Sequence, residues 1–239
     1  MIQKLKSVVQ QRSLSRSVRR TIKSARKRNL TYLSEAKLTS LATLCRVHEE
    51  KNIPGVIIEA GCALGGSSIV LTEAKQIERK LRVYDVFGMI PPPSQKDGED
   101  VHKRYETIES GQSRGIGGDT YYGYVEDLYQ QVQSSFESLG YPPGANNVQL
   151  IKGLVQDTLE VPGPVCLAHI DVDWYEPVMT CLRRIEPMLS PGGSIVLDDY
   201  QDWSGCRRAT DEYFADRRDG GYTFDQSSGA IVITKAMVN

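Results

Sequence analysis

The chain has 239 residues, of which 40% are hydrophobic and 25% charged, as in a globular α/β domain of ordinary size. Its net charge of −1 gives no support for nucleic acid as a partner, and no stretch approaches the roughly 20 apolar residues of a transmembrane segment. Five scattered cysteines without a C-x-x-C pair argue against a zinc or redox motif and favour a reducing, cytoplasmic location.

The first 30 residues are a basic arm with ten Lys or Arg and no acid, whereas the remainder holds 19 bases and 30 acids. Transit peptides share this composition. However, apolar residues recur along the arm at a helical spacing, namely Leu5, Val8, Val9, Leu14, Val18 and Ile22. We therefore expect residues 1–30 to form a helix packed on the acidic body or on a second subunit of a homo-oligomer. A membrane surface or an acidic partner is the alternative.

After the arm, Ser34 is a suitable N-cap for an amphipathic helix that carries Leu38, Leu41, Leu44 and Val47. Strands and helices then alternate. Strands are predicted at 56–60, 81–86, 148–152, 165–171 and 194–197, helices at 66–74, 178–189 and 206–217, and a closing strand pair at 222–224 and 230–234. This alternation predicts a doubly wound, Rossmann-like α/β sheet, mostly parallel with a closing antiparallel strand, plus N-terminal helices.

Residues 88–147 interrupt the alternation. They contain Pro91-Pro92-Pro93, several glycines, and a tyrosine cluster at Tyr121, Tyr122 and Tyr124. An insertion of this length in a domain is usually functional. We expect a lid or substrate-facing segment within the main domain of residues 31–239, with a plain surface excursion as the alternative.

The strand at 56–60 runs directly into a glycine-rich turn and a helix, where backbone N–H groups face a ligand at the carboxyl edge of the sheet. The turn does not match the G-x-G-x-x-G spacing of a dinucleotide site. It reads Glu59-Ala60-Gly61-Cys62-Ala63-Leu64-Gly65-Gly66-Ser67. Glu59 can hold an ammonium and Ser67, at the helix start, a carboxylate. S-adenosylmethionine carries both groups on its methionyl end, so we expect it as the cofactor.

Two further residues fit the rest of that cofactor. Asp85, about twenty residues beyond the loop at the end of the second strand, is positioned to accept both ribose hydroxyls. Gln156, after the strand at 148–152, can pair with the adenine amino group, although a plain surface role fits it nearly as well.

Acidic side chains follow two neighbouring strands, as Asp171 and Asp173 after one and Asp198-Asp199 after the next. Carboxylates that meet at one sheet edge repel one another unless a cation lies among them, and their oxygens suit Mg²⁺ or another divalent cation. We prefer Asp171, Asp198 and Asp199 as ligands, while a turn after the strand would part Asp173 from Asp171. Acids that merely cap helices are the alternative. Asp171 is also the preferred general base, with His169 as the alternative.

Together these stretches resemble the macrocin O-methyltransferase family, metal-dependent enzymes that methylate hydroxyls on sugars of natural products. The resemblance spans most of residues 30–235, including the segment around Tyr32, which we assign to the cofactor site. It implies that Asp171, Asp198 and Asp199 bind the metal and that Asp171 is the base. For the basic arm, the motifs identify no counterpart in that family. Catechol O-methyltransferases look similar, but they have Asn where this chain has Asp199 and a catalytic lysine where it has Trp174.

We therefore predict an S-adenosylmethionine- and metal-dependent O-methyltransferase acting on a small hydroxylated molecule, a sugar or a glycosylated natural product. Asp171-Val172-Asp173 would also fit the D-x-D of a glycosyltransferase, but that leaves Asp198-Asp199 and the Glu59 loop unexplained. A noncatalytic binding protein with the same fold is the third possibility.

Overall fold

Two helices precede the first strand of the computed structural model, which describes residues 14–217 and 221–237. They are α1 (Arg16–Lys27) and α2 (Glu35–Glu50). Ser15 caps α1, and Ser34 caps α2 by accepting a hydrogen bond from the Lys37 backbone N–H. Leu14, Val18 and Ile22 are buried, as the helical spacing of the arm predicts, whereas Leu5, Val8 and Val9 lie outside the described residues.

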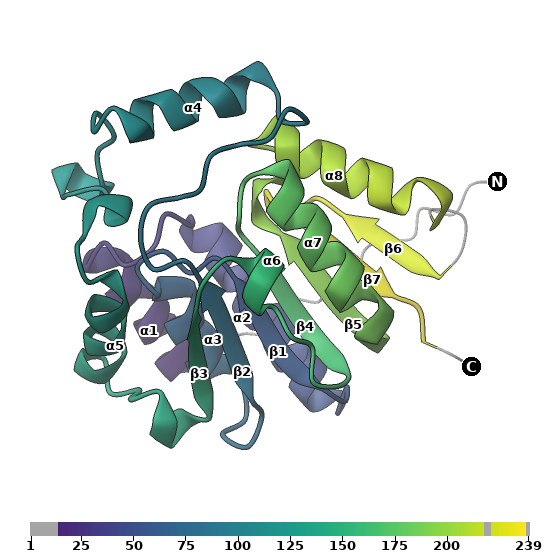
Figure 1. The fold of residues 1–239 in the computed structure, drawn as a ribbon. Helices are drawn as coiled ribbons and strands as arrows, with labels where there is room; N and C mark the ends of the chain where they lie inside the picture. Colours follow the sequence, from purple (N-terminus) through teal and green to yellow (C-terminus); the bar gives the residue numbers. More distant parts are fainter. Residues whose placement is uncertain (1–13, 218–220, 238–239) are drawn as a thin grey trace.

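Seven strands form one sheet in the order β3-β2-β1-β4-β5-β7-β6 (Figure 1). Only β7 runs antiparallel to its neighbours, β5 and β6. The predicted fold class, a mostly parallel sheet with a closing antiparallel strand, is confirmed. The strands are β1 (Val56–Ala60), β2 (Leu81–Asp85), β3 (Val148–Lys152), β4 (Val165–Ile170), β5 (Leu189–Leu197), β6 (Tyr222–Asp225) and β7 (Ile231–Lys235).

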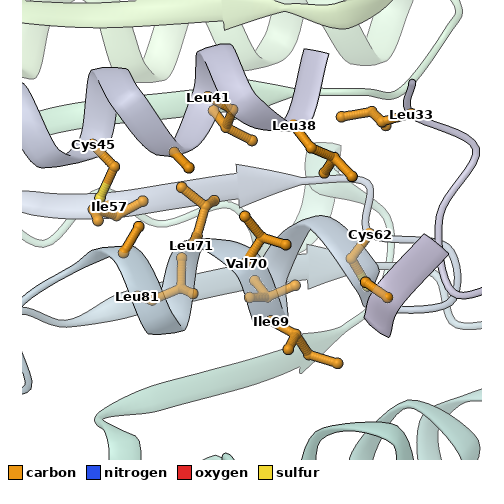
Figure 2. Close-up of a cluster of buried hydrophobic side chains, with 14 of the residues drawn as sticks. Leu33, Leu38, Leu41, Cys45, Ile57, Cys62, Ile69, Val70, Leu71 and Leu81 are labelled. Carbon is orange, nitrogen blue, oxygen red and sulfur yellow. The ribbon is translucent and has the colours of Figure 1, made fainter. Parts of the chain in front are cut away.

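Helices cover both faces of this sheet because alternate strand residues are apolar on each side. One face packs against α1, α2, α3 (Gly66–Ala74) and α5 (Leu128–Ser138). Figure 2 shows side chains of α2, β1 and α3 meeting in this layer. The other face packs against α6 (Val155–Thr158), α7 (Tyr175–Ile185) and α8 (Ser204–Phe214). Helices change sides between β1 and β4, and a doubly wound sheet binds ligands at the carboxyl ends of such strands.

The insertion is less irregular than the sequence predicts. It contains α4 (Glu99–Glu109) and α5, and Val132 and Phe136 of α5 are fully buried against the sheet. Helix α5 therefore belongs to the layered core. The predicted lid is then restricted to residues 88–127. Short 3₁₀ turns fill the remaining connections: η1 (Ile116–Gly118), η2 (Tyr122–Tyr124), η3 (Gly144–Asn146), η4 (Glu186–Met188), η5 (Asp198–Tyr200) and η6 (Ala215–Arg217).

Element boundaries differ from the predictions mainly around β5. The predicted turn at Pro191-Gly192-Gly193 lies inside this strand, and the pairing of β4 with β5 shifts register there. None of the described helices is both long enough and apolar enough to cross a membrane.

Candidate active site

The loop between β1 and α3 adopts a conformation that favours glycine at several positions. Gly61 has a φ of +84°, and a Cβ there would lie 1.8 Å from the backbone oxygen of Asp171, just after β4. Gly65 has a φ of +85°, and Ala63 a φ of +46°, a region that L-residues enter only at a cost. The loop is thus packed tightly against the tip of β4, which brings the predicted cofactor site and the predicted acidic site together.

The start of α3 is packed against the N-terminal segment. The Gly66 backbone N–H donates to the Leu30 oxygen at 2.8 Å, and a Cβ at Gly66 would lie 2.4 Å from that oxygen. Gly66 is therefore required by this contact as well as by the entry into the helix. Ser67 is buried in the first turn, and its predicted contact with a carboxylate stays a prediction.

Glu59 lies deeper than predicted. Its side chain is fully buried, accepting a hydrogen bond from the Ser68 hydroxyl on one oxygen and lying 2.8 Å from Nδ1 of His169 on the other. Although burial opposes a charge on the ring, Asp198 and Glu59 raise the pKa of His169 to about 9. This buried contact joins β1 to β4. The predicted roles of Glu59 in holding an ammonium and of His169 as the alternative base stay predictions.

Asp85 ties the cofactor loop to the end of β2. One carboxylate oxygen accepts hydrogen bonds from the backbone N–H groups of Cys62 at 2.7 Å and Ala63 at 3.0 Å, and the other accepts from Phe87 at 2.7 Å. Burial raises the pKa of Asp85, and these three donors oppose that shift. Because a carboxylate oxygen can accept more than one hydrogen bond, this arrangement leaves acceptor capacity for a ligand.

Three carboxylates meet after β4 and β5. One oxygen each of Asp171, Asp173 and Asp199 lies within 4.8 Å of the others. Burial and the negative charges of Asp198 and Asp173 hold the pKa of Asp171 well above its usual range, and burial with Asp173 and Asp171 does the same for Asp199. These acids fit a hard divalent cation, whose charge would relieve the repulsion and whose preferred ligands are carboxylate oxygens.

The predicted ligands Asp171, Asp198 and Asp199 fall into two groups and stay a prediction. Asp171 and Asp199 lie in the triad with Asp173, whereas Asp198 lies in a second group, with Asp199 and Asp202, whose ligand oxygens are also within 4.8 Å of one another. The chain does turn after β4, at Asp173 with a φ of +54°, but the turn does not part it from Asp171. Asp198 also faces Lys37 of α2, whose Nζ lies 2.9 Å from its Oδ2 and 3.1 Å from Oδ2 of Asp202. Burial opposes ionisation of Asp198, yet His169 and Lys37 lower its pKa.

A pocket opens at this edge of the sheet. It is lined by the loop between β1 and α3, the segments that follow β2, β3 and β4, and residues of the predicted lid. The predicted site residues in its wall are Gly61, Asp85, Gln156 and Asp171. Oε1 of Gln156 is buried without a hydrogen-bond partner among the described residues, so a donor on a ligand would satisfy it.

A model of the macrocin-O-methyltransferase family matches residues 2–219. The chain belongs to this family. The match includes the basic arm, for which the motifs alone identified no counterpart.

A named relative agrees with this assignment. An 8-demethyl-8-(2,3-dimethoxy-alpha-L-rhamnosyl)-tetracenomycin-C 4′-O-methyltransferase from Streptomyces olivaceus is 29% identical over 167 residues. The aligned part covers 67% of this chain but only 58% of that relative, so this chain spans less than two thirds of its length.

Among solved structures, the O-methyltransferase NovP is 20% identical, with a TM-score of 0.70 over 87% of this chain and 83% of its own. The O-methyltransferase TomG from Streptomyces achromogenes, solved with SAM, is 16% identical, with a TM-score of 0.55 over 95% and 92%. At these identities the likeness establishes the fold.

Residues 88–127 of this macrocin-O-methyltransferase family member, the predicted lid, bring a cluster of tyrosines to the pocket. Tyr122 lines the pocket and lies 4.5 Å from Tyr121 between ring centroids. The ring centroid of Tyr32 lies 5.9 Å from that of Tyr122, and Tyr32 is 47% exposed, so its predicted place at the cofactor site stays a prediction. The guanidinium of Arg104 lies over the Tyr121 ring, 5.5 Å from its centroid.

Three residues of the site were not among the predicted ones. Asp173 was set aside because a turn was expected after the strand. Lys37 was missed because no local sequence pattern relates α2 to the end of β5. Tyr122 was missed because the tyrosine cluster does not indicate which ring faces the pocket. For Tyr122, the tyrosine cluster was the available signal. No sequence spacing could have indicated the contact between Lys37 and Asp198, which are 161 residues apart in the chain.

Proposed function

We propose that this chain is an S-adenosylmethionine-dependent O-methyltransferase that methylates a hydroxyl of a small molecule, a sugar or a glycosylated natural product, with the help of a divalent cation such as Mg²⁺. Family membership supports methyl transfer, and the rhamnosyl compound in the name of the Streptomyces olivaceus relative supports a glycosylated acceptor. The observation that carries the proposal is the pocket lined by Asp85 and Gln156 together with Asp171 and Asp173 of the acidic triad.

The cofactor would lie across the carboxyl ends of β1, β2 and β3. Asp85 would accept hydrogen bonds from the ribose hydroxyls, with its orientation already fixed by the loop N–H groups. The unpaired Oε1 of Gln156 would accept from the adenine amino group. The loop from Gly61 to Gly65 would approach the methionyl end, because only small residues leave the backbone accessible there.

The acceptor would enter between the acidic triad and Tyr122. Asp171, Asp173 and Asp199 would hold the cation, which when bound lowers the pKa of a coordinated hydroxyl. A carboxylate of the triad would take the hydroxyl proton, and S-adenosylmethionine would supply the methyl group to the hydroxyl oxygen and be released as S-adenosylhomocysteine. Asp171 is the base predicted from sequence, and Asp173, which lines the same pocket, is the second carboxylate within reach of an acceptor.

Tyr122 lines the pocket together with Asp171 and Asp173 of the triad, and the buried Tyr121 packs behind it. The Tyr122 ring would pack against the sugar ring of the acceptor and keep water from the reacting hydroxyl. This assigns the lid of residues 88–127 to acceptor binding, which agrees with its position at the pocket mouth.

Calorimetric titration separates this proposal from the other functions considered. S-adenosylmethionine is expected to bind, while NAD and UDP-sugars give no heat. Binding of a UDP-sugar without S-adenosylmethionine binding would instead support a glycosyltransferase.

A homo-oligomer and a cytoplasmic location remain predictions. The second is supported by the five cysteines, which are all free and buried, as expected in a reducing compartment.

A further inference from the structure

One face of α1 carries a row of cations that the proposed activity does not use. Arg16, Arg19, Arg20, Lys23 and Lys27 line a shallow groove along this helix, and all five side chains are exposed. Their spacing of three and four residues places them along one side of a helix. The face lies away from the cofactor pocket, whose lining includes no residue of α1.

The charge of this row is not balanced within the part of the chain that the structure describes. None of the five cations forms an ion pair there, and residues 14–28 contain no acid. Arg16–Arg20, Arg19–Lys23 and Lys23–Lys27 are like-charge pairs at i, i+4, which destabilise a helix. Arg16 and Arg19 also lie near the helix N-terminus, where the dipole disfavours cations. An anionic partner would offset these unfavourable terms.

The opposite face of α1 is already occupied. Val18, Ile22 and Ala25 are buried in the core, and the hydroxyl of Thr21 lies 2.9 Å from that of Tyr141. The helix is therefore fixed on the body and has no free apolar face to insert into a partner. Any contact made through its cations is a surface contact governed by charge.

We propose that the cationic face of α1 docks this protein on the headgroup plane of an acidic phospholipid bilayer. A 12-residue helix is about 18 Å long, so the row can meet several phosphates of a flat anionic surface at once. Nucleic acid fits less well, because α1 has no aromatic side chain to stack on a base.

Vesicle co-sedimentation with the full chain tests this proposal. The protein is expected to bind vesicles of phosphatidylcholine mixed with phosphatidylglycerol, and not vesicles of phosphatidylcholine alone. Binding should be lost at about 1 M salt, where the Debye length falls to about 3 Å. Replacing Arg19, Arg20 and Lys23 by Gln should weaken binding by on the order of 100-fold, since each cation near an acidic membrane contributes about a fivefold gain.

A matched control removes the same charge elsewhere. Lys51, Lys80 and Arg183 are exposed cations on other elements, and their replacement by Gln should leave vesicle binding within about twofold. Thermal unfolding and S-adenosylmethionine titration of both variants verify that fold and pocket are intact. The proposal is overturned if acidic vesicles are not bound, if both variants lose binding equally, if the α1 variant keeps it, or if duplex DNA is bound more tightly than the vesicles.

Discussion

The contacts of Asp85 make Asp85→Asn an informative variant, because they couple stability to cofactor binding. The carboxylate accepts from three backbone N–H groups, two on one oxygen and one on the other. An amide has a single acceptor oxygen, so at least one of these donors is left facing an NH₂ group. A buried donor without a partner costs about 1–3 kcal/mol.

The cost predicts two measurable changes. For a chain of this size a loss of about 2 kcal/mol lowers the midpoint of thermal unfolding by about 4–8 °C. Loss of a charged acceptor for a ribose hydroxyl, worth about 1.5–3 kcal/mol, should weaken S-adenosylhomocysteine binding by about 10- to 150-fold. Differential scanning calorimetry and isothermal titration measure the two effects separately.

Asp157→Asn is the matched control, since this exposed carboxylate of α6 lies close to Gln156 in the chain. It should change the midpoint by no more than about 1 °C and the affinity by no more than about twofold. If Asp85→Asn behaved like this control in both assays, the clamp on the cofactor loop and the ribose contact would both be refuted.

Three further variants probe other parts of the account. Gly61→Ala places a Cβ 1.8 Å from the Asp171 oxygen and should destabilise the fold by more than about 2 kcal/mol in denaturant titration; an unchanged midpoint contradicts the tight loop. Gln156→Leu should weaken S-adenosylmethionine binding by about 2- to 12-fold, and unaltered affinity argues against the adenine contact. Burial and the charges of Lys51 and Arg79 lower the pKa of His48 to about 4, so this ring stays neutral in the folded state while it protonates near pH 6.5 in the unfolded one. Stability should therefore fall by about 3 kcal/mol between pH 6.5 and pH 4, and His48→Gln should remove that part of the loss; an identical pH profile for the variant contradicts it.

The sheet could be predicted because its signals are local. Each buried parallel strand is a short apolar run bounded by a turn, and the runs at 56–60 and 148–152 match β1 and β3 in full. Helix α2 was identified by Ser34 and by the spacing of its leucines. The start of β5 was harder to predict, because Pro191 and the two glycines after it suggest a turn, whereas β5 pairs with β4 on both sides of them with a shifted register.

The position of the site could be predicted from the sequence, but the contacts among its side chains could not. The edge where strands β1, β2 and β4 end was identified by topology, and Asp85, Gln156 and Asp171 do line one pocket. Which way each side chain turns depends on distant partners. Glu59 faces His169 and Asp198 faces Lys37, and both pairings join segments more than 100 residues apart. The left-handed conformation at Asp173, which brings its carboxylate into the triad, also has no signal in residue type alone.

Metal-supplemented methyl transfer tests the central claim most directly. The chain is incubated with S-adenosylmethionine and a panel of glycosides, and S-adenosylhomocysteine formation is followed with Mg²⁺, with EDTA, and with the Asp171→Asn variant. The account predicts turnover of at least one glycoside that EDTA abolishes and Mg²⁺ restores, and a variant that still binds S-adenosylmethionine but does not turn over. Turnover that survives both EDTA and Asp171→Asn would contradict it.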